Sequence, residues 1–175
     1  MDKKILVAYA TKYGATGEIA DKVGEVLQGT GFQVDVSPVD RVQDLTSYGA
    51  VVLGSAVYIG KWRKEAVKLL KENQEALAER QVWLFSSGPL GEGDPVELLD
   101  GWSLPTSLQP IVDRIQPRDI AVFHGYLNPE KINFLEKWML KNIQSPIGDF
   151  RDWEAITSWA ESIAAELKDI DPFVE

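Results

Sequence analysis

Residues able to bind a phosphate group follow the first apolar run of the sequence. Residues 4–10 (KILVAYA) are almost continuously apolar and lead into residues 11–16 (TKYGAT), after which a helical pattern begins. Two threonine hydroxyls, a glycine and the free backbone N–H groups at a helix start are groups that cradle phosphates in proteins. The segment therefore predicts a phosphate site. The alternative is an ordinary turn in which Thr16 is the N-cap of the helix.

Two further loops of small residues follow apolar runs later in the chain. Residues 54–62 (GSAVYIGKW) overlap the end of the run 50–57, and residues 86–91 (SSGPLG) come at the end of the run 82–86. Small side chains let the backbone approach a ligand closely, and Tyr58 could face a planar ring. The alternative is a glycine-rich connection whose aromatic side chains pack on the next helix. Three such loops after three strands predict one shared ligand site.

His124, the one histidine of the chain, follows the apolar run 120–123. It is a candidate catalytic residue that could supply a proton beside a bound ring. The alternative is a histidine that forms hydrogen bonds for structural reasons. With one histidine and no cysteine, the sequence argues against disulfides, iron–sulfur clusters and multi-histidine metal sites, and no metal site is predicted. The dinucleotide, P-loop and nucleophile-elbow motifs are also missing.

Short apolar runs alternate with helical periods along the chain, and runs of this kind are typical of strands buried on both faces. The predicted strands are 4–10, 32–36, 50–57, 82–86 and 120–123. The predicted helices run from about Thr16 to Gly29, across 63–78, and from Trp153 to Leu167 with Asp152 as N-cap. This alternation predicts one α/β domain over residues 1–175, with a doubly wound parallel sheet whose carboxyl edge gathers the three loops.

Two segments do not fit the alternation. Residues 88–105 are a Gly/Pro-rich stretch, too long for a simple connection, which we expect to be a functional lid or a mobile loop. Residues 129–143 are predicted to form a helix that could contact a quinone, a membrane surface or a second subunit, or could simply face the core broadly. Its two apolar stripes are Ile132, Leu135, Met139 and Ile143, and beside them Phe134 and Trp138.

The chain as a whole is acidic. Its 175 residues include 27 Asp and Glu against 18 Lys and Arg, a formal net charge of −9. Such a charge repels phosphate backbones and argues against nucleic acid as a partner. The apolar run 4–10 is too short for the core of a signal peptide, and no run reaches the length of a membrane span. The sequence therefore predicts a cytoplasmic protein.

Residues 11–16 resemble the FMN phosphate loop of flavodoxins, T-x-T-G-x-T, with Tyr13 in place of the middle threonine. Segments 123–129 (FHGYLNP) and 148–153 (GDFRDW) look more narrowly like the flavodoxin-domain group that includes the menaquinone-dependent protoporphyrinogen oxidases. The resemblance implies a three-layer flavodoxin-like fold of strand order 2-1-3-4-5 with FMN at the switch point. It implies that the FMN phosphate is bound by Thr11, Lys12, Tyr13, Gly14, Ala15 and Thr16. It implies ring contacts from Ser55, Ala56, Val57, Tyr58, Ser87, Gly88, Pro89, Leu90 and Gly91.

One departure from typical flavodoxins bears on function. Those proteins place an aromatic side chain in the loop after strand four to cover the flavin, whereas this loop offers Leu90, and the next aromatic is Trp102. A ring left open, a long lid and an apolar helix favour an FMN-dependent oxidoreductase. Such an enzyme would transfer two electrons or a hydride between an organic substrate and an acceptor such as a quinone.

Charge favours a different function. The stretch after strand four is acidic, which suits a one-electron carrier that docks to basic redox partners. These acids would also repel the carboxylates of a porphyrin, although three basic residues on the neighbouring loop could offset them. The acids are Glu92, Asp94, Glu97 and Asp100, and the basic residues are Lys61, Arg63 and Lys64. A flavin-free binding module is the third alternative.

Overall fold

The fold is built on a parallel β-sheet, and the computed structural model of the chain describes residues 4–142 and 146–170. Five strands lie in the order β2-β1-β3-β5-β6, and each neighbouring pair is parallel. They are β1 (Lys4–Ala10), β2 (Val34–Pro38), β3 (Tyr48–Tyr58), β5 (Gln81–Ser87) and β6 (Asp119–Phe123). The expected strand order 2-1-3-4-5 is confirmed, with β5 and β6 as the fourth and fifth parallel strands.

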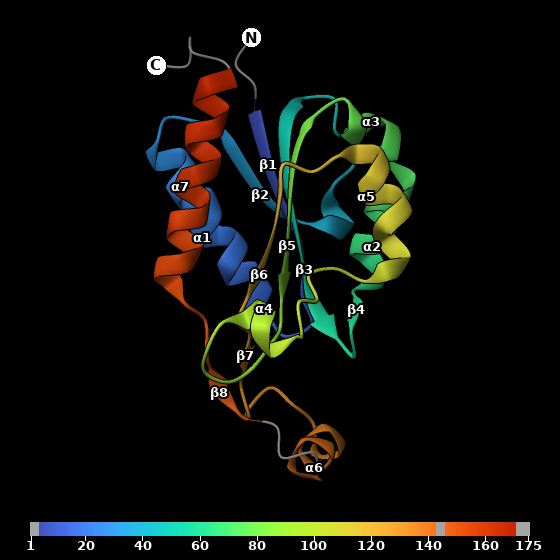
Figure 1. The fold of residues 1–175 in the computed structure, drawn as a ribbon, viewed down its shortest axis with the longest axis vertical. Coiled ribbons are helices and arrows are strands. Elements are labelled where there is room, and N and C mark those ends of the chain that lie inside the picture. The colour runs from blue at the N-terminus through green and yellow to red at the C-terminus, as the bar shows by residue number, and fades with distance from the viewer. Residues whose placement is uncertain (1–3, 143–145, 171–175) are drawn as a thin grey trace.

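Two layers of helices cover the sheet, one on each face (Figure 1). On one face α1 (Ala15–Gly29) packs beside α7 (Trp153–Ile170), and Ile19 and Ile156 are fully buried between these helices and the sheet. The other face is covered by α2 (Lys64–Glu72), α3 (Gln74–Ala78) and α5 (Gln109–Ile115), which enclose a second apolar cluster. Because both faces of the central strands are buried, their sequences are continuously apolar rather than alternating.

Some helix ends follow local sequence signals. Asp152 is the predicted N-cap of α7, and its carboxylate accepts a hydrogen bond from the Ala155 N–H at 3.0 Å. The alternative interpretation of this loop, in which Thr16 is the N-cap of α1, is wrong. Gly14, with a φ of 97°, is the N-cap, and Thr16 lies in the first turn. Glycine adopts this left-handed conformation without a steric penalty, so the chain turns directly from β1 into α1.

Several predicted elements have different bounds in the structure, and two of them differ for a clear local reason. The predicted strand 32–36 is observed as β2, two residues later, because Phe32 still bonds back through its N–H to the Leu27 carbonyl of α1. A short 3₁₀ turn, η1 (Val39–Arg41), follows β2. The predicted helix 63–78 is broken into α2 and α3 at Asn73, whose side-chain amide donates to the Leu69 carbonyl at 2.9 Å. Asparagine commonly ends a helix through such local hydrogen bonds.

The Gly/Pro-rich segment 88–105 contains one short helix, α4 (Pro95–Leu98), capped by the side chain of Asp94. It is tied to the sheet by the buried hydroxyl of Ser86, which donates to the Ser103 carbonyl at 2.9 Å. The 3₁₀ turn η2 (Thr106–Leu108) and α5 come next, and no pattern in the sequence predicts them. A seven-residue helix is too short for its 3.6-residue period to stand out.

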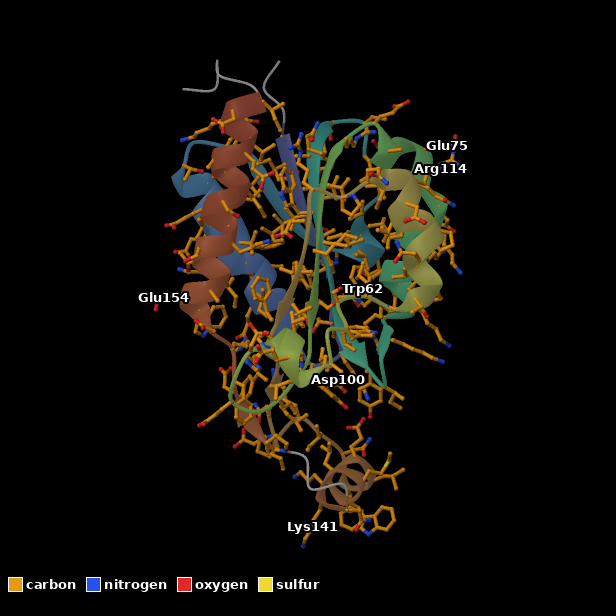
Figure 2. The ribbon with its side chains drawn as sticks, in the orientation of Figure 1. Trp62, Glu75, Asp100, Arg114, Lys141 and Glu154 are labelled. Carbon is orange, nitrogen blue, oxygen red and sulfur yellow. The ribbon has the colours of Figure 1, made fainter. Side chains whose placement is uncertain are left out.

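α6 (Phe134–Asn142) lies apart from the sheet, beyond its carboxyl edge, where Figure 2 labels Lys141. It is shorter than the predicted helix 129–143, and Ile143 falls outside the described residues. The antiparallel pair β7 (Tyr126–Leu127) and β8 (Gly148–Asp149) carries the chain out to α6 and back. None of residues 134–142 is buried, and Phe134 and Trp138 are 86% and 58% exposed. The alternative of a helix facing the core is therefore wrong.

Across residues 4–142 and 146–170, no helix is both long enough and apolar enough to span a bilayer.

Candidate functional site

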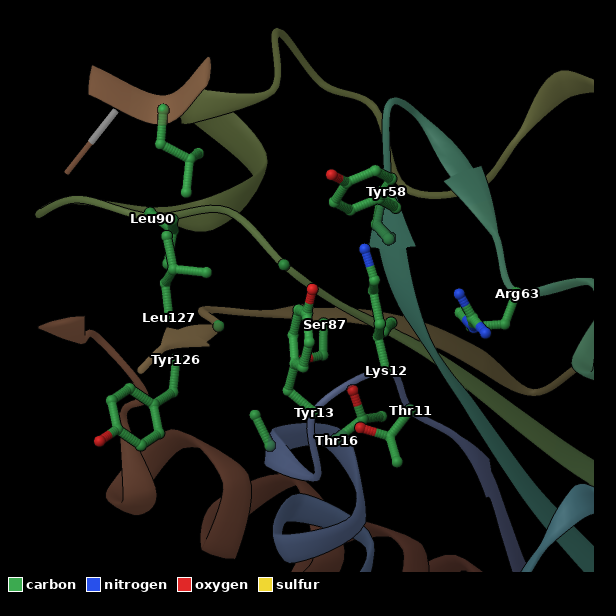
Figure 3. A pocket seen from close by; sticks show the side chains of 16 residues that line it. Thr11, Lys12, Tyr13, Thr16, Tyr58, Arg63, Ser87, Leu90, Tyr126 and Leu127 are labelled. Atoms are coloured by element: carbon green, nitrogen blue, oxygen red, sulfur yellow. The ribbon is translucent and has the colours of Figure 1, made fainter. Parts of the chain in front are cut away.

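A cavity of about 160 Å³ opens at the carboxyl edge of the sheet. It lies between the loop after β1, the ends of β3 and β5, and the segment that follows β6 (Figure 3). Parallel strands all end at this edge, so the three loops meet there. The lining residues are Thr11, Lys12, Tyr13, Ala15, Thr16, Ala56, Val57, Tyr58, Arg63, Ser87, Gly88, Leu90, Gly125, Tyr126, Leu127 and Leu140.

The loop after β1 forms one wall and presents free hydrogen-bond donors. Thr11 Oγ1 accepts a hydrogen bond from the Gly14 N–H at 2.9 Å, which closes the loop. α1 then begins at Ala15 without a side-chain cap, so the N–H groups of its first turn lack partners within the helix. The buried Thr16 lies in this turn. A helix start with free N–H groups and two hydroxyls is suited to a phosphate group.

The ends of β3 and β5 meet at very short range beside this wall. A Cβ added at Gly88 would lie 3.1 Å from Val57 Cβ, and one added at Gly125 would lie 3.1 Å from Gly88 Cα. Larger residues at these two positions would push the strand ends apart, so glycine sets the width of the site. The predicted ring residues that line the cavity here are Ala56, Val57, Tyr58, Ser87, Gly88 and Leu90.

Three of the predicted ring residues do not line the cavity. Ser55 is fully buried, and its hydroxyl accepts a hydrogen bond from the Arg63 N–H at 2.9 Å, which fixes the hairpin of β3 and β4 (Lys61–Trp62). The Pro89 carbonyl accepts from the Gly125 N–H at 3.0 Å. Gly91 lines a neighbouring cavity. These residues shape the walls of the site from behind.

His124 also lies outside the cavity, and it is buried. Its Nδ1 is 3.1 Å from the Pro89 carbonyl oxygen, and its Nε2 is 2.7 Å from the Gly93 carbonyl oxygen. The ring therefore ties β6 to residues 89–93, the loop that carries Leu90. This geometry favours the structural alternative, and a catalytic role for His124 stays a prediction.

Five lining residues were not among the predicted site residues. Arg63 follows β4, and three others follow β6, so the rule that sites lie at strand ends could have found them. Leu140 belongs to α6, and nothing in the sequence places that helix at the cavity. The five residues are Arg63, Gly125, Tyr126, Leu127 and Leu140.

The electrostatics of the site centre on a carboxylate of α6. Glu136 Oε1 is 2.5 Å from Lys12 Nζ, and its other oxygen accepts a hydrogen bond from the Tyr13 hydroxyl. The Lys12 ammonium, followed by that hydroxyl, lowers the pKa of Glu136 from 4.5 to about 2. In return, Glu136 raises the pKa of Lys12. Lys12 also lies over the Tyr58 ring, 4.2 Å from its centroid.

Arg63 supplies a second positive charge. Its Nη2 is 3.6 Å from Glu65 Oε1, while its buried Nε has no hydrogen-bond partner among the described residues. A buried donor without a partner is unusual, because a missing hydrogen bond costs about 1–3 kcal/mol. Arg63 lines the cavity, and its positive charge there suits an anionic ligand.

These features together fit FMN and define a class of protein. The helix start and the threonines fit the phosphate, the positive charge of Arg63 fits an anionic group, and the close glycine walls with Tyr58 and Leu90 fit a flat ring. Such a site at the switch point of a β2-β1-β3-β5-β6 sheet is that of a flavodoxin-like protein.

The chain belongs to the family described as Flavodoxin domain, whose profile matches residues 6–153. It is 23% identical over 172 residues to protoporphyrinogen IX dehydrogenase (quinone) of Escherichia coli (strain K12), over 92% of this chain and 94% of that protein. A flavodoxin from the domain Archaea superposes with a TM-score of 0.62 at 14% identity, over 94% of this chain and 99% of that one. Flavodoxin 2 from Bacillus cereus gives 0.58 at 21% identity, over 93% and 99%. The family and these folds imply that the chain binds FMN.

Proposed function

We propose that this flavodoxin-type redox protein is an FMN-dependent oxidoreductase that transfers two electrons between an organic substrate and an acceptor such as a quinone. When bound, FMN exchanges electrons singly or as a hydride. The observation that carries the proposal is the apolar surface around the cavity. Leu90, Leu127 and Leu140 line it, and no aromatic residue of segment 86–91 is available to cover a ring.

The apolar side chains of α6 support the same proposal. Leu140 reaches the cavity, while Phe134, Leu135, Trp138 and Met139 are exposed on the same helix. An exposed apolar surface beside a redox site suits a large, poorly soluble organic molecule, which can bury its own apolar surface there. Contact of segment 129–143 with a membrane or a second copy stays a prediction, as does a location in the cytoplasm.

The curated relative suggests a substrate class. The E. coli protein is named for protoporphyrinogen IX and quinone, and a porphyrinogen carries carboxylates. The acidic segment would repel them, but Arg63 lines the cavity itself, and Lys61 is exposed nearby. Charges at the cavity act at shorter range than those of the exposed segment, so they favour the carboxylates.

A one-electron carrier is the second candidate, and the acidic segment favours it. Glu92, Asp94, Glu97 and Asp100 are all exposed; Glu97 lies in α4, and the other three lie in the loops on either side of it. Such a surface attracts basic partners and speeds their association.

A reductive titration separates the two functions. The FMN-loaded protein is titrated with dithionite without oxygen and is then assayed with protoporphyrinogen and a soluble quinone. Uptake of both electrons in one stage, with quinone-dependent oxidation, is the result expected of the enzyme. Two well-separated one-electron stages without turnover would instead establish the carrier. Leu140→Asp should abolish turnover while FMN still binds. Leu98 is exposed and lies outside the cavity, so Leu98→Asp should leave both turnover and FMN binding unchanged.

A further inference from the structure

α6 is joined to the rest of the molecule mainly through polar contacts. None of its residues is buried, so packing contributes little to its position. Its acidic residue Glu136 contacts Lys12 and Tyr13 of the phosphate loop. Just before the helix, Lys131 Nζ donates to the Tyr13 carbonyl at 3.2 Å. The helix is therefore held by the loop that forms the phosphate cradle.

Glu136 connects the two elements through one carboxylate. Oε1 accepts from Lys12, and Oε2 accepts from Tyr13 and also from the Asn133 N–H at 3.2 Å. The Glu136 N–H in turn donates to Asn133 Oδ1 at 2.8 Å, which completes a capping box at the start of α6. The same group thus stabilises the first turn of the helix and fixes two side chains of the cradle.

These contacts leave the cradle free for a ligand. Lys12 and Tyr13 use their side chains to hold α6, and in Figure 3 the Lys12 side chain points away from Thr11 and Thr16 toward Tyr58. The backbone N–H groups at the start of α1 and the two threonine hydroxyls remain available for a phosphate. Glu136 and a phosphate can therefore hold the loop at the same time, with different atoms.

We propose that Glu136 is a positioning residue that couples α6 to phosphate binding. It orders the loop before a phosphate ester arrives, and the bound phosphate, by ordering the same loop, holds α6 more firmly in place. Two ligands that order one segment reinforce each other, because the second binds to a loop whose entropy has already been lost. The proposal rests on FMN as the ligand of the cradle.

Hydrogen exchange of α6 tests the coupling without any activity assay. We expect Glu136→Gln to speed amide exchange of residues 134–142 at least fivefold in the ligand-free protein and to raise the dissociation constant of FMN about fivefold, at the lower end of typical coupling factors. Glu130→Gln, which removes the same charge from an exposed position on the same segment, should change neither. In the unaltered protein FMN should slow this exchange, whereas riboflavin, which lacks the phosphate, should not.

Two results would overturn the proposal. Unchanged exchange of α6 in Glu136→Gln would show that Glu136 does not hold the helix. Faster exchange with unchanged FMN affinity would show that the helix and the cradle are not coupled. A double-mutant cycle adds a check. As a single substitution, Lys12→Met should speed the exchange of α6. Added to Glu136→Gln it should have little further effect, because both substitutions remove the same ion pair. If FMN failed to bind the unaltered protein, the proposed function would fall, while the ligand-free comparison would still decide whether Glu136 holds α6.

Discussion

Thr11 and Thr16 place their hydroxyls at the cradle by different means. Thr11 follows β1, and its Oγ1 accepts a hydrogen bond from the Gly14 N–H at 2.9 Å. Thr16 lies in the first turn of α1 and is only 1% exposed, so its orientation is set by the surrounding packing. Both residues are thus in place before a ligand binds, which lowers the entropy lost on binding.

Removal of both hydroxyls should weaken FMN binding. Thr11→Val with Thr16→Val keeps the shape of each side chain and removes two hydrogen bonds to a charged phosphate. At roughly 1.5 kcal/mol or more for each bond, the dissociation constant should rise by about a hundredfold. An absorbance titration with FMN measures it. Thr157→Val, on the outer part of α7, is the matched control and should bind FMN normally. Normal affinity in the double variant would mean that the phosphate lies elsewhere.

At the scale of the element, α6 shows how a helix can be amphipathic in sequence and yet remain unpacked. Its stripe of Leu135 and Met139 is exposed, and its place is set by Glu136 and by the β7–β8 pair that carries it. A helix held by an ion pair responds to pH, unlike one held by buried apolar area.

Low pH should release α6. Because Lys12 holds the pKa of Glu136 at about 2, below its ordinary 4.5, the ion pair contributes fully above about pH 4.5 and is lost as the pH falls toward 2. Hydrogen exchange of residues 134–142, corrected for its intrinsic pH dependence and compared with β5, should show progressive opening of α6 between pH 4.5 and 2.5. In Glu136→Gln the exchange of α6 should be fast throughout. A parallel change in both proteins would point to general acid unfolding instead.

At the scale of the whole molecule, Arg151 joins elements from both ends of the chain. Its side chain is 5% exposed and pairs with Asp149 of β8 at 2.7 Å and with Glu18 of α1 at 2.5 Å. Its guanidinium also lies over the rings of Tyr126 and Trp153, 5.0 and 4.6 Å from their centroids. Arg151 therefore connects the start of α7, the start of α1 and the β7–β8 pair.

Loss of this side chain should destabilise the whole fold. Arg151→Ala leaves Asp149 without the cation that lowers its pKa and removes the guanidinium from the rings of Tyr126 and Trp153. Because Asp149 and Glu18 are 39% and 60% exposed, solvent screens the two ion pairs, and the expected loss is about 2 kcal/mol. Urea unfolding measures the free energy. Arg118→Ala, which breaks a half-exposed pair with Glu166, is the control and should cost less than about 1 kcal/mol. Equal losses in the two variants would contradict a central role for Arg151.

The sequence by itself determined the layered sheet and most of the cradle. Continuous apolar runs at β1, β3 and β5 require burial on both faces, and parallel strands must bring their carboxyl ends to one edge. The sequence therefore predicts, without any information on distant contacts, that the loops at 11–16, 54–62 and 86–91 meet at this edge. The break at Asn73 and the later start of β2 changed only the bounds of elements.

Only the tertiary structure decided how distant parts of the chain complete the site. Glu136 lies 124 residues from Lys12, and no local period or motif indicates that they meet. The apolar stripe of α6 would look the same whether it packed on the core or faced solvent, because hydrophobic periodicity records which side chains share a face and not what covers that face. His124 is a similar case, since its position after β6 does not say whether the ring points into the cavity or back toward Pro89 and Gly93.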